Sequence, residues 1–267
     1  MKGLMLPWKK PVFSPERVGR LRPRIAGAWG LPAPTIAGCC LLNEETELVV
    51  EWDHCWLEDQ AIETEAQWLN VLVAERLPEV VGAFALAWRQ TPETLLLATD
   101  ALGERSLFYG RQGQGLVFAS SLELLLKSGC FQPRLQPLAL ARYLTYAYVP
   151  GHETLLDGLH ELEPGCLLMV SARGLQKTVY WQLPTDQGAP LKSEAEYKQE
   201  LRASLVRAMH RRLPDGAVHA SLSGGIDSSL VVALAKQARA EVYTYSLSFG
   251  EAYRHELPFS TTTSHRR

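Results

Sequence analysis

The sequence of 267 residues predicts two parts: an α+β part rich in antiparallel strand pairs, then the beginning of a doubly wound parallel sheet. Short apolar runs that come in pairs around turns predict the antiparallel part. A glycine-rich turn at 221–230, between an apolar run and a helical stripe, predicts the parallel part. Turn residues at 185–190 predict the linker, so we expect domains at 1–191 and 192–267.

The composition is that of a folded protein, because 46% hydrophobic residues suffice for a sizeable core. A net charge of −2 and a pI near 6.4 provide no basic surface for nucleic acid. No apolar run is long enough for a membrane span, and the apolar start is too short for a signal peptide, so we expect a cytoplasmic protein. The cysteines, odd in number and without zinc-ligand spacing, are expected to be buried reduced thiols: Cys39, Cys40, Cys55, Cys130 and Cys166.

In the first part, residues 1–23 show no period and are expected to be an irregular arm. Apolar runs predict strands at 24–30, 48–52, 84–88, 94–99, 107–109, 116–119, 167–170 and 177–181. Helical spacing predicts helices at 64–76, 121–127 and 138–146. In the helix at 64–76, the shared face of Trp68, Val71 and Leu72 is expected to be buried.

In the second part, Ser193 and Glu196 form a capping box that predicts a helix start. This helix carries one apolar stripe, and arginines that complement the helix dipole lie towards its end: Tyr197, Leu201, Leu205 and Met209, then Arg207, Arg211 and Arg212. The run 217–222, which contains His219, is expected to be a buried strand.

The glycine-rich loop is followed by a helix and then by a second strand at 241–249. The expected apolar stripe of that helix is Leu230, Val231, Leu234, Ala235 and Ala238. The 18 residues after Phe249 show no apolar period, so we expect the parallel sheet to be incomplete in this chain. An uncovered strand edge is a template for pairing, and we therefore expect the chain to aggregate or to recruit a partner.

The loop Ser-Gly-Gly-Ile-Asp-Ser-Ser at 223–229 has the chemistry of an anion site. Adjacent glycines let the backbone turn tightly and approach a ligand closely. The following helix offers unpaired N–H groups and the positive end of its dipole. Ser223, Ser228 and Ser229 add hydroxyl groups. No lysine follows the glycines, so the pattern differs from the Walker loop.

Asp227 distinguishes this loop from an ordinary phosphate loop. A carboxylate repels phosphate unless a cation lies between them, and Mg²⁺ bound by both groups would supply that cation. The alternative is a glycine turn in which Asp227 and the serines cap a helix. The complete motif at a strand–helix joint favours the nucleotide site, and it resembles the pyrophosphate loop of the ATP pyrophosphatases.

Motifs in the same order along the chain resemble the glutamine-hydrolysing asparagine synthetase family. The matching stretches are GAFALAW at 82–88, DALG at 100–103, FAS at 118–120, YVPG at 148–151, YWQLP at 180–184, SGGIDSS at 223–229 and YSLSF at 245–249. That family joins a glutaminase domain of the N-terminal-nucleophile type to an ATP-pyrophosphatase domain. The resemblance therefore implies an N-terminal-nucleophile-hydrolase-like α+β domain, followed here by an incomplete α/β ATP-pyrophosphatase domain.

The glutaminase half departs from the family at its nucleophile. The family begins Cys-Gly-Ile-Ala-Gly, and the cysteine needs its own α-amino group as the base, so it must be the first residue. Here Ile25-Ala26-Gly27 matches, but Pro23 occupies the nucleophile position and an extension precedes it. The segments that hold glutamine are absent, and Glu63-Thr64-Glu65 only faintly resembles the segment that binds its amino group. We therefore expect a degenerate domain with no catalytic residue and no glutamine hydrolysis.

The resemblance implies ATP-dependent amide-bond formation through an acyl-adenylate, with release of AMP and pyrophosphate. The implied substrates are ATP, with Mg²⁺ bound by Asp227, and a carboxylate, which is aspartate in the family. The resemblance assigns ATP binding to Leu222, Ser223, Gly224, Gly225, Ile226, Asp227, Ser228 and Leu247. The backbone N–H groups of Gly224, Gly225 and Ile226 are expected to hold the pyrophosphate, and Leu222 and Leu247 match the positions that contact adenosine in the family.

Three alternatives stay open. β-Lactam synthetases and lasso-peptide cyclases keep this loop and lack the glutaminase cysteine. A catalytically dead fragment could bind a partner chain through its half-sheet. A split enzyme would receive its C-terminal half from a separate chain.

Overall fold

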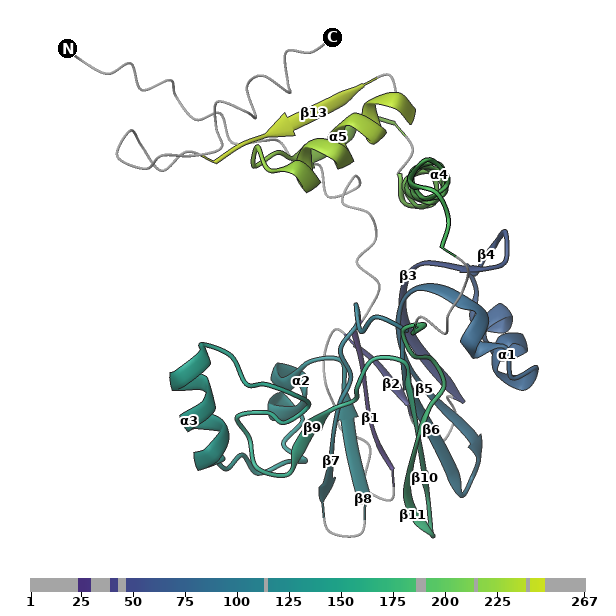
Figure 1. Cartoon of the computed structure of the whole chain (residues 1–267). Coiled ribbons are helices and arrows are strands. Elements are labelled where there is room, and N and C mark those ends of the chain that lie inside the picture. Colours follow the sequence, from purple (N-terminus) through teal and green to yellow (C-terminus); the bar gives the residue numbers. More distant parts are fainter. Residues whose placement is uncertain are drawn as a thin grey trace, which may run out of the picture. The chain divides into compact units, whose positions relative to one another are not determined.

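The structure, a computed structural model, divides into two compact units, Met1–Pro184 and Thr185–Arg267 (Figure 1). It describes residues 24–29, 39–42, 47–112, 115–185, 191–213, 216–238 and 241–247. Within these ranges no helix is both long and apolar enough to cross a membrane.

The first unit contains two sheets whose neighbouring strands are antiparallel, except for the parallel pair β1 and β2. One sheet has the order β2 (Cys39–Leu42), β1 (Arg24–Trp29), β8 (Gly115–Ala119), β7 (Phe108–Gln112) and β9 (Leu159–Glu161). The other has the order β11 (Gly174–Val179), β10 (Cys166–Ser171), β6 (Thr94–Thr99), β5 (Val80–Thr91), β3 (Leu48–Leu57) and β4 (Gln60–Ala61).

The sheets pack face to face, and a helix covers the outer face of each (Figure 1). Between the sheets, Ile25 and Phe118 meet side chains such as Leu97. Alternation along β5 sends Ala85 and Ala87 to this inner core, and Phe84, Leu86 and Trp88 to the outer face. There α1 (Glu65–Val73) packs, while α2 (Leu122–Lys127) covers the five-stranded sheet. A short η1 (Leu77–Glu79) follows α1.

The antiparallel part is confirmed, since the predicted pairs 84–88 with 94–99, 107–109 with 116–119, and 167–170 with 177–181 correspond to β5–β6, β7–β8 and β10–β11. Trp68, Val71 and Leu72 are buried as predicted. The sequence pattern missed three short strands, β2, β4 and β9, which have at most four residues each.

Helix α3 (Pro137–Tyr146) leaves most of its apolar side chains in solvent. Only Ala139 is buried. The exposed side chains on and beside it are Leu135, Leu138, Tyr143, Leu144, Tyr146 and Tyr148.

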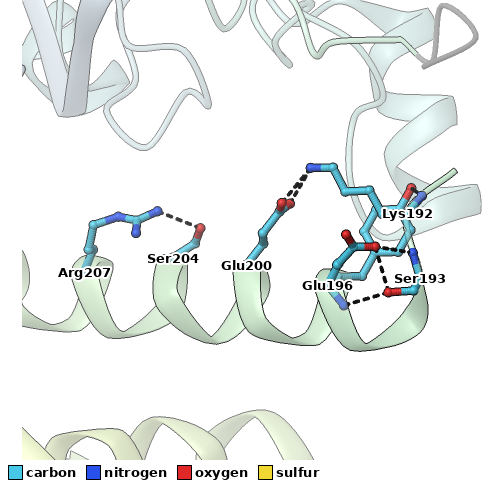
Figure 2. A network of polar contacts seen from close by, with 7 residues as sticks. Lys192, Ser193, Glu196, Glu200, Ser204 and Arg207 are labelled. Carbon is cyan, nitrogen blue, oxygen red and sulfur yellow. Dashed lines mark hydrogen bonds and ion pairs between the residues drawn. The ribbon is translucent and has the colours of Figure 1, made fainter. Parts of the chain in front are cut away.

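The second unit is a β–α–β arrangement preceded by a long helix. Helix α4 (Glu194–Arg212) begins with the predicted capping box, in which the Ser193 Oγ accepts from the Glu196 N–H, and Glu196 accepts from the Ser193 N–H (Figure 2). Strands β12 (Val218–Ser221) and β13 (Val242–Tyr245) are parallel and joined by α5 (Ile226–Ala238). A small pocket between α4 and α5 is lined by Val206, Met209, His210, Leu234, Gln237 and Ala238.

The prediction of a buried strand at 217–222 is wrong for most of its residues, because in β12 only Val218 is buried and His219 is exposed. The predicted apolar stripe of α5 is only partly covered. Ala235 of that stripe is buried, whereas Leu230 and Val231 are exposed, and Val232, which lies outside the stripe, is buried. Helical spacing identifies an apolar stripe, but it does not tell which face of the helix another element covers. Within the described residues, the sheet of this unit has only two strands, so it can cover only a small part of α5.

The second strand is shorter than the predicted 241–249, because β13 ends at Tyr245 and Ser246 and Leu247 are not part of it. Phe249 lies outside the described residues.

Candidate nucleotide-binding site

The loop between β12 and α5 lies at the carboxyl edge of the parallel strand pair. Ser221 is paired with Tyr245, so Leu222 and Ser246 are the first residues after the two strands. The Leu222 N–H donates to the Tyr245 carbonyl at 2.8 Å, and the Ser246 hydroxyl donates to the Leu222 carbonyl at 2.6 Å. In open parallel sheets this edge is where ligands bind.

Gly224 makes the turn from the strand to the helix. Its φ of +99° is a conformation that residues with a Cβ rarely adopt. Of the two adjacent glycines, Gly224 is therefore the one that the backbone requires.

The hydroxyl groups predicted to hold phosphate bind one another in this structure. The Oγ atoms of Ser223 and Ser228 are 3.0 Å apart. The Ser223 Oγ accepts from the Gly225 N–H at 3.3 Å, and the Ser228 Oγ donates to the Gly225 carbonyl at 3.2 Å. These contacts hold the loop in one conformation, and a phosphate oxygen would have to replace part of this set.

The backbone hydrogen bonds of the loop indicate which N–H groups could bind an anion. The Ser229 N–H donates to the Gly225 carbonyl at 3.1 Å, which places Gly225 at the helix cap. The N–H groups of Ile226, Asp227 and Ser228 come before this first helical bond and have no carbonyl of the same helix to bind. The predicted donors were Gly224, Gly225 and Ile226, but the Gly225 N–H is directed at Ser223. The positive end of the helix dipole remains available to an anion.

Asp227 lies exposed in the first turn of α5. No group of three or more His, Cys, Asp or Glu side chains that could hold a metal occurs in the described part of the chain. A protein-built metal cage is therefore not visible there. One carboxylate suits Mg²⁺, which in nucleotide sites is bound by one or two carboxylates, phosphate oxygens and water.

The two leucines predicted to contact adenosine lie in opposite environments. The Leu222 side chain is 1% exposed, and the backbone N–H and carbonyl of Leu222 are bound to the second strand end. Leu247 is 82% exposed, so its side chain is open to a ligand. Their assignment to adenosine stays a prediction.

An aromatic cluster on the exposed face of the two strands was not predicted. His219 stacks on Tyr243 at 5.2 Å and on Tyr245 at 5.8 Å between ring centroids, and its Nδ1 is 2.9 Å from the Tyr245 hydroxyl. The Tyr243 hydroxyl donates to Glu241, and this hydrogen bond raises the pKa of Tyr243. The sequence did contain a signal for this cluster. In Val-His-Ala-Ser and Val-Tyr-Thr-Tyr the aromatic residues occupy every second position, and such alternation indicates a strand with one exposed face.

In the first unit, the predicted nucleophile position, Pro23, lies outside the described residues. Arg24, which follows it, donates to the Ser121 hydroxyl at 3.4 Å. Thr64 caps α1, and the Gln67 side chain accepts from the N–H groups of Thr64 and Glu63. The segment at 63–65 therefore starts a helix in this structure.

The cysteines are partly as predicted. Cys55 and Cys166 are buried free thiols, but Cys130 is only half-buried. Burial raises the pKa of the Cys166 thiol, which makes it a poorer nucleophile at neutral pH. The side chains of Cys39 and Cys40 lie outside those that the structure describes.

Two family models match the chain in succession. Residues 63–181 match a glutamine amidotransferase domain, and residues 200–266 match asparagine synthase. The chain is 29% identical to asparagine synthetase [glutamine-hydrolyzing] 3 of Bacillus subtilis, over 64% of this chain and 29% of that protein. It is 30% identical to a putative asparagine synthetase [glutamine-hydrolyzing] of Mycobacterium tuberculosis, over 66% of this chain and 28% of that protein. The match thus spans less than a third of either relative.

Among solved structures, the glutamine phosphoribosylpyrophosphate amidotransferase of B. subtilis is 16% identical, with 74% of this chain and 40% of that chain covered. Its TM-score of 0.28 is too low to support an argument about fold or function.

Proposed function

We propose that this chain, a relative of the asparagine synthetases, takes part in ATP-dependent amide-bond formation. The premise is the order of its two matched segments, a glutamine amidotransferase segment followed by an asparagine synthase segment. A substrate carboxylate attacks the α-phosphorus of ATP, which forms an acyl-adenylate and releases pyrophosphate. An amine then attacks the acyl carbon, and AMP leaves. Aspartate is the proposed acid, because the relatives are named asparagine synthetases.

One observation carries this proposal: the Ser-Gly-Gly-Ile-Asp-Ser-Ser loop lies at a strand–helix joint. Gly224 makes the turn with a φ of +99°, and the first N–H groups of α5 precede the first helical hydrogen bond, so no carbonyl of the helix binds them. Backbone N–H groups and the hydroxyls of Ser223 and Ser228 hold the pyrophosphate. The backbone N–H groups at the start of α5 are already fixed by the fold, so they stabilise developing negative charge without reorganising. The two hydroxyls exchange part of their mutual hydrogen bonds for phosphate oxygens.

Asp227 binds the Mg²⁺ that accompanies ATP. The cation neutralises phosphate charge and so removes the repulsion between the phosphates and the carboxylate. The exposed position of Asp227 in the first turn of α5 supports this role, since the carboxylate faces no other cation in the contacts of the described residues.

We further propose that the chain lacks glutaminase activity. An N-terminal cysteine needs its own amino group as the base, and Pro23 occupies that position here. Incubation with glutamine should release no more glutamate than a heat-killed control. Release that a thiol alkylator abolishes would contradict this part of the proposal.

One alternative has specific support. The loss of the glutaminase cysteine at Pro23 favours an amide-forming enzyme of the β-lactam synthetase or lasso-peptide cyclase kind, which uses its own amine substrate. A split enzyme, in which a separate chain supplies further sequence, is a second hypothesis. A catalytically dead fragment that binds a partner remains a third hypothesis, and it predicts that no assay below detects chemistry.

The test is exchange of labelled pyrophosphate into ATP, which requires reversible acyl-adenylate formation. The chain is assayed alone and with the separately produced C-terminal segment of the B. subtilis relative, each with and without aspartate. We expect aspartate-dependent exchange in at least one mixture, and its loss in Asp227→Asn. No exchange in any mixture would contradict the proposed function, and exchange without dependence on Asp227 would contradict the assigned site.

A further inference from the structure

We propose that Ser246 is a positioning residue that sets the conformation of the phosphate loop, an inference that rests on the proposed function only for what the loop binds. Ser246 lies outside the loop, 24 residues from Leu222 along the chain. Its hydroxyl nevertheless makes a direct side-chain contact with the backbone from which the loop begins.

The contact is short and partly shielded from water. The Ser246 Oγ donates to the Leu222 carbonyl at 2.6 Å, near the short end of hydroxyl hydrogen bonds. Leu222 is held on two further sides, because its N–H donates to the Tyr245 carbonyl and its side chain is buried. The carbonyl of Leu222 therefore has little freedom while Ser246 holds it.

This hydrogen bond also fixes the first peptide of the loop. The carbonyl of Leu222 and the N–H of Ser223 belong to one rigid planar unit. The described residues contain no cis peptide bond, so the two groups point in opposite directions. By holding the carbonyl of Leu222, Ser246 determines the direction of the Ser223 N–H.

From Ser223 the contacts continue to the first turn of α5. The Ser223 Oγ accepts from the Gly225 N–H at 3.3 Å and lies 3.0 Å from the Ser228 Oγ. Ser246 thus stands at the start of a continuous set of hydrogen bonds that runs through the loop. Rotation of the Leu222–Ser223 peptide would displace Ser223 from both of these partners.

The competing explanation is that Ser246 only stabilises the second unit as a whole. The two explanations differ in where the structure loosens. A positioning role predicts faster amide exchange within 222–228 alone, while general stabilisation predicts faster exchange throughout α4, α5 and both strands.

Hydrogen exchange of the full chain separates them. In Ser246→Ala we expect about tenfold faster exchange at 222–228, the effect of losing one partly buried hydrogen bond, with an unchanged thermal midpoint. Ser246→Thr keeps the hydroxyl and should exchange as wild type. Ser204→Ala is the matched control, because its hydroxyl contacts Arg207 on the exposed side of α4 (Figure 2). Uniformly faster exchange in Ser246→Ala, or no change, would overturn the proposal.

Titration with ATP and Mg²⁺ tests the consequence for binding. We expect a Kd about tenfold higher for Ser246→Ala and a wild-type Kd for Ser246→Thr and Ser204→Ala. If wild type fails to bind ATP, the loop is not an ATP site in this chain alone, and the amide-exchange pattern by itself decides the role of Ser246. If wild type binds and Ser246→Ala binds equally well, Ser246 does not position the binding loop.

Discussion

Helices α1 and α4 begin in the same way and differ in what they bury. Each starts with a capping box, Thr64 with Gln67 in α1 and Ser193 with Glu196 in α4. Yet α1 buries three of its 9 residues, whereas α4 buries none of its 19. A helix start depends on local chemistry, while burial depends on whether another element lies against the apolar face.

The strands of the two units show the same contrast. In β5, the four residues from Phe84 to Ala87 have no exposed surface, because sheets or helices cover both faces. In β12 only Val218 is buried. Since buried apolar area is the main source of stability, the first unit should be the more stable and the second should yield first to denaturant.

Trp68→Ala should have the largest effect on the difference in stability between the two units, because it should destabilise the first unit by about 3–5 kcal/mol. Trp68 is 0% exposed and packs on Trp52 and Phe84, at 6.3 and 4.9 Å between ring centroids. Urea unfolding followed by far-UV circular dichroism measures the loss. Trp68→Phe is the control and should cost much less, since it keeps a ring and removes an indole N–H that has no partner among the described residues. A loss below about 1 kcal/mol for Trp68→Ala would show that α1 is not part of the core.

Asp100→Ala should cost the first unit roughly 2–4 kcal/mol. The Asp100 carboxylate is 1% exposed and accepts four backbone N–H groups. Their donors are Phe84 at 3.2 Å and Leu102, Glu104 and Arg105 at 3.0 Å each. The alanine leaves these groups without their acceptor, whereas Asp100→Asn keeps one carbonyl oxygen and should fall between wild type and alanine. Equal stability of the asparagine and alanine variants in urea would contradict this explanation.

Ser193→Ala removes the cap of α4 and should cost about 1 kcal/mol. The Ser193 hydroxyl accepts from the Glu196 N–H and contacts the Glu196 carboxylate (Figure 2). Because α4 has no buried residue, the loss should appear as faster amide exchange in its first turns. Exchange that stays at the wild-type rate there would mean that the cap is not needed.

Glu163→Gln should flatten the pH dependence of the first unit. Burial is the largest single influence on Glu163 and opposes its ionisation. The hydrogen bond from Lys177, a backbone hydrogen bond and the charges of His152 and Lys177 together outweigh burial, so the pKa of Glu163 is lowered. The hydrogen bond between Glu163 and Lys177 also raises the pKa of Lys177. The carboxylate therefore contributes stability above its unfolded pKa of about 4.3, which is lost as the pH falls through the lower folded value. The lysine contributes below its unfolded pKa of about 10.4, and this is lost as the pH rises through the raised folded value.

The effect should be less than about 1 kcal/mol, because Lys177 is 40% exposed and solvent screens the pair. Thermal midpoints of wild type should fall faster than those of Glu163→Gln between about pH 5 and 3. Glu93→Gln, an exposed glutamate in the turn after β5, serves as the control. Parallel pH profiles for wild type and Glu163→Gln would contradict the assignment.

Leu201→Ala should have the smallest effect, within about 0.5 kcal/mol. Leu201 is 61% exposed although it belongs to the apolar stripe of α4. Unfolding of the full chain in urea measures it. A loss of unfolding free energy above about 2 kcal/mol would mean that another element covers this face in solution. In that case α4 would bury its apolar face as α1 does.

The sequence was sufficient where a signal is local. The paired runs at 84–88 and 94–99 and the cap of α4 were predicted from spacing and turn chemistry, whereas the cap of α1 at Thr64 was not predicted. The family resemblance is confirmed by matches in both units. Spacing also located the loop at a strand–helix joint, because an apolar run typical of a strand is followed there by apolar residues at helical spacing.

The rest depended on contacts between distant residues. Spacing predicted the apolar stripe of α5 but could not tell that Val232, not Val231, would be buried. The contact between Ser246 and Leu222 joins residues 24 positions apart, and no pattern in either segment indicates it. The mutual hydrogen bonds of Ser223 and Ser228 likewise depend on the exact turn at Gly224.

Equilibrium binding of ATP to the full chain, with and without Mg²⁺, tests the central claim that the loop at 221–230 is a Mg²⁺–ATP site. Wild type should bind ATP weakly and only with Mg²⁺, because the Asp227 carboxylate repels bare phosphate. Asp227→Asn should bind Mg²⁺–ATP roughly tenfold more weakly, yet bind metal-free ATP more tightly than wild type. Glu200→Gln, which removes the same charge from α4, should change neither affinity. Binding that ignores both Mg²⁺ and the substitution at Asp227 would contradict the claim.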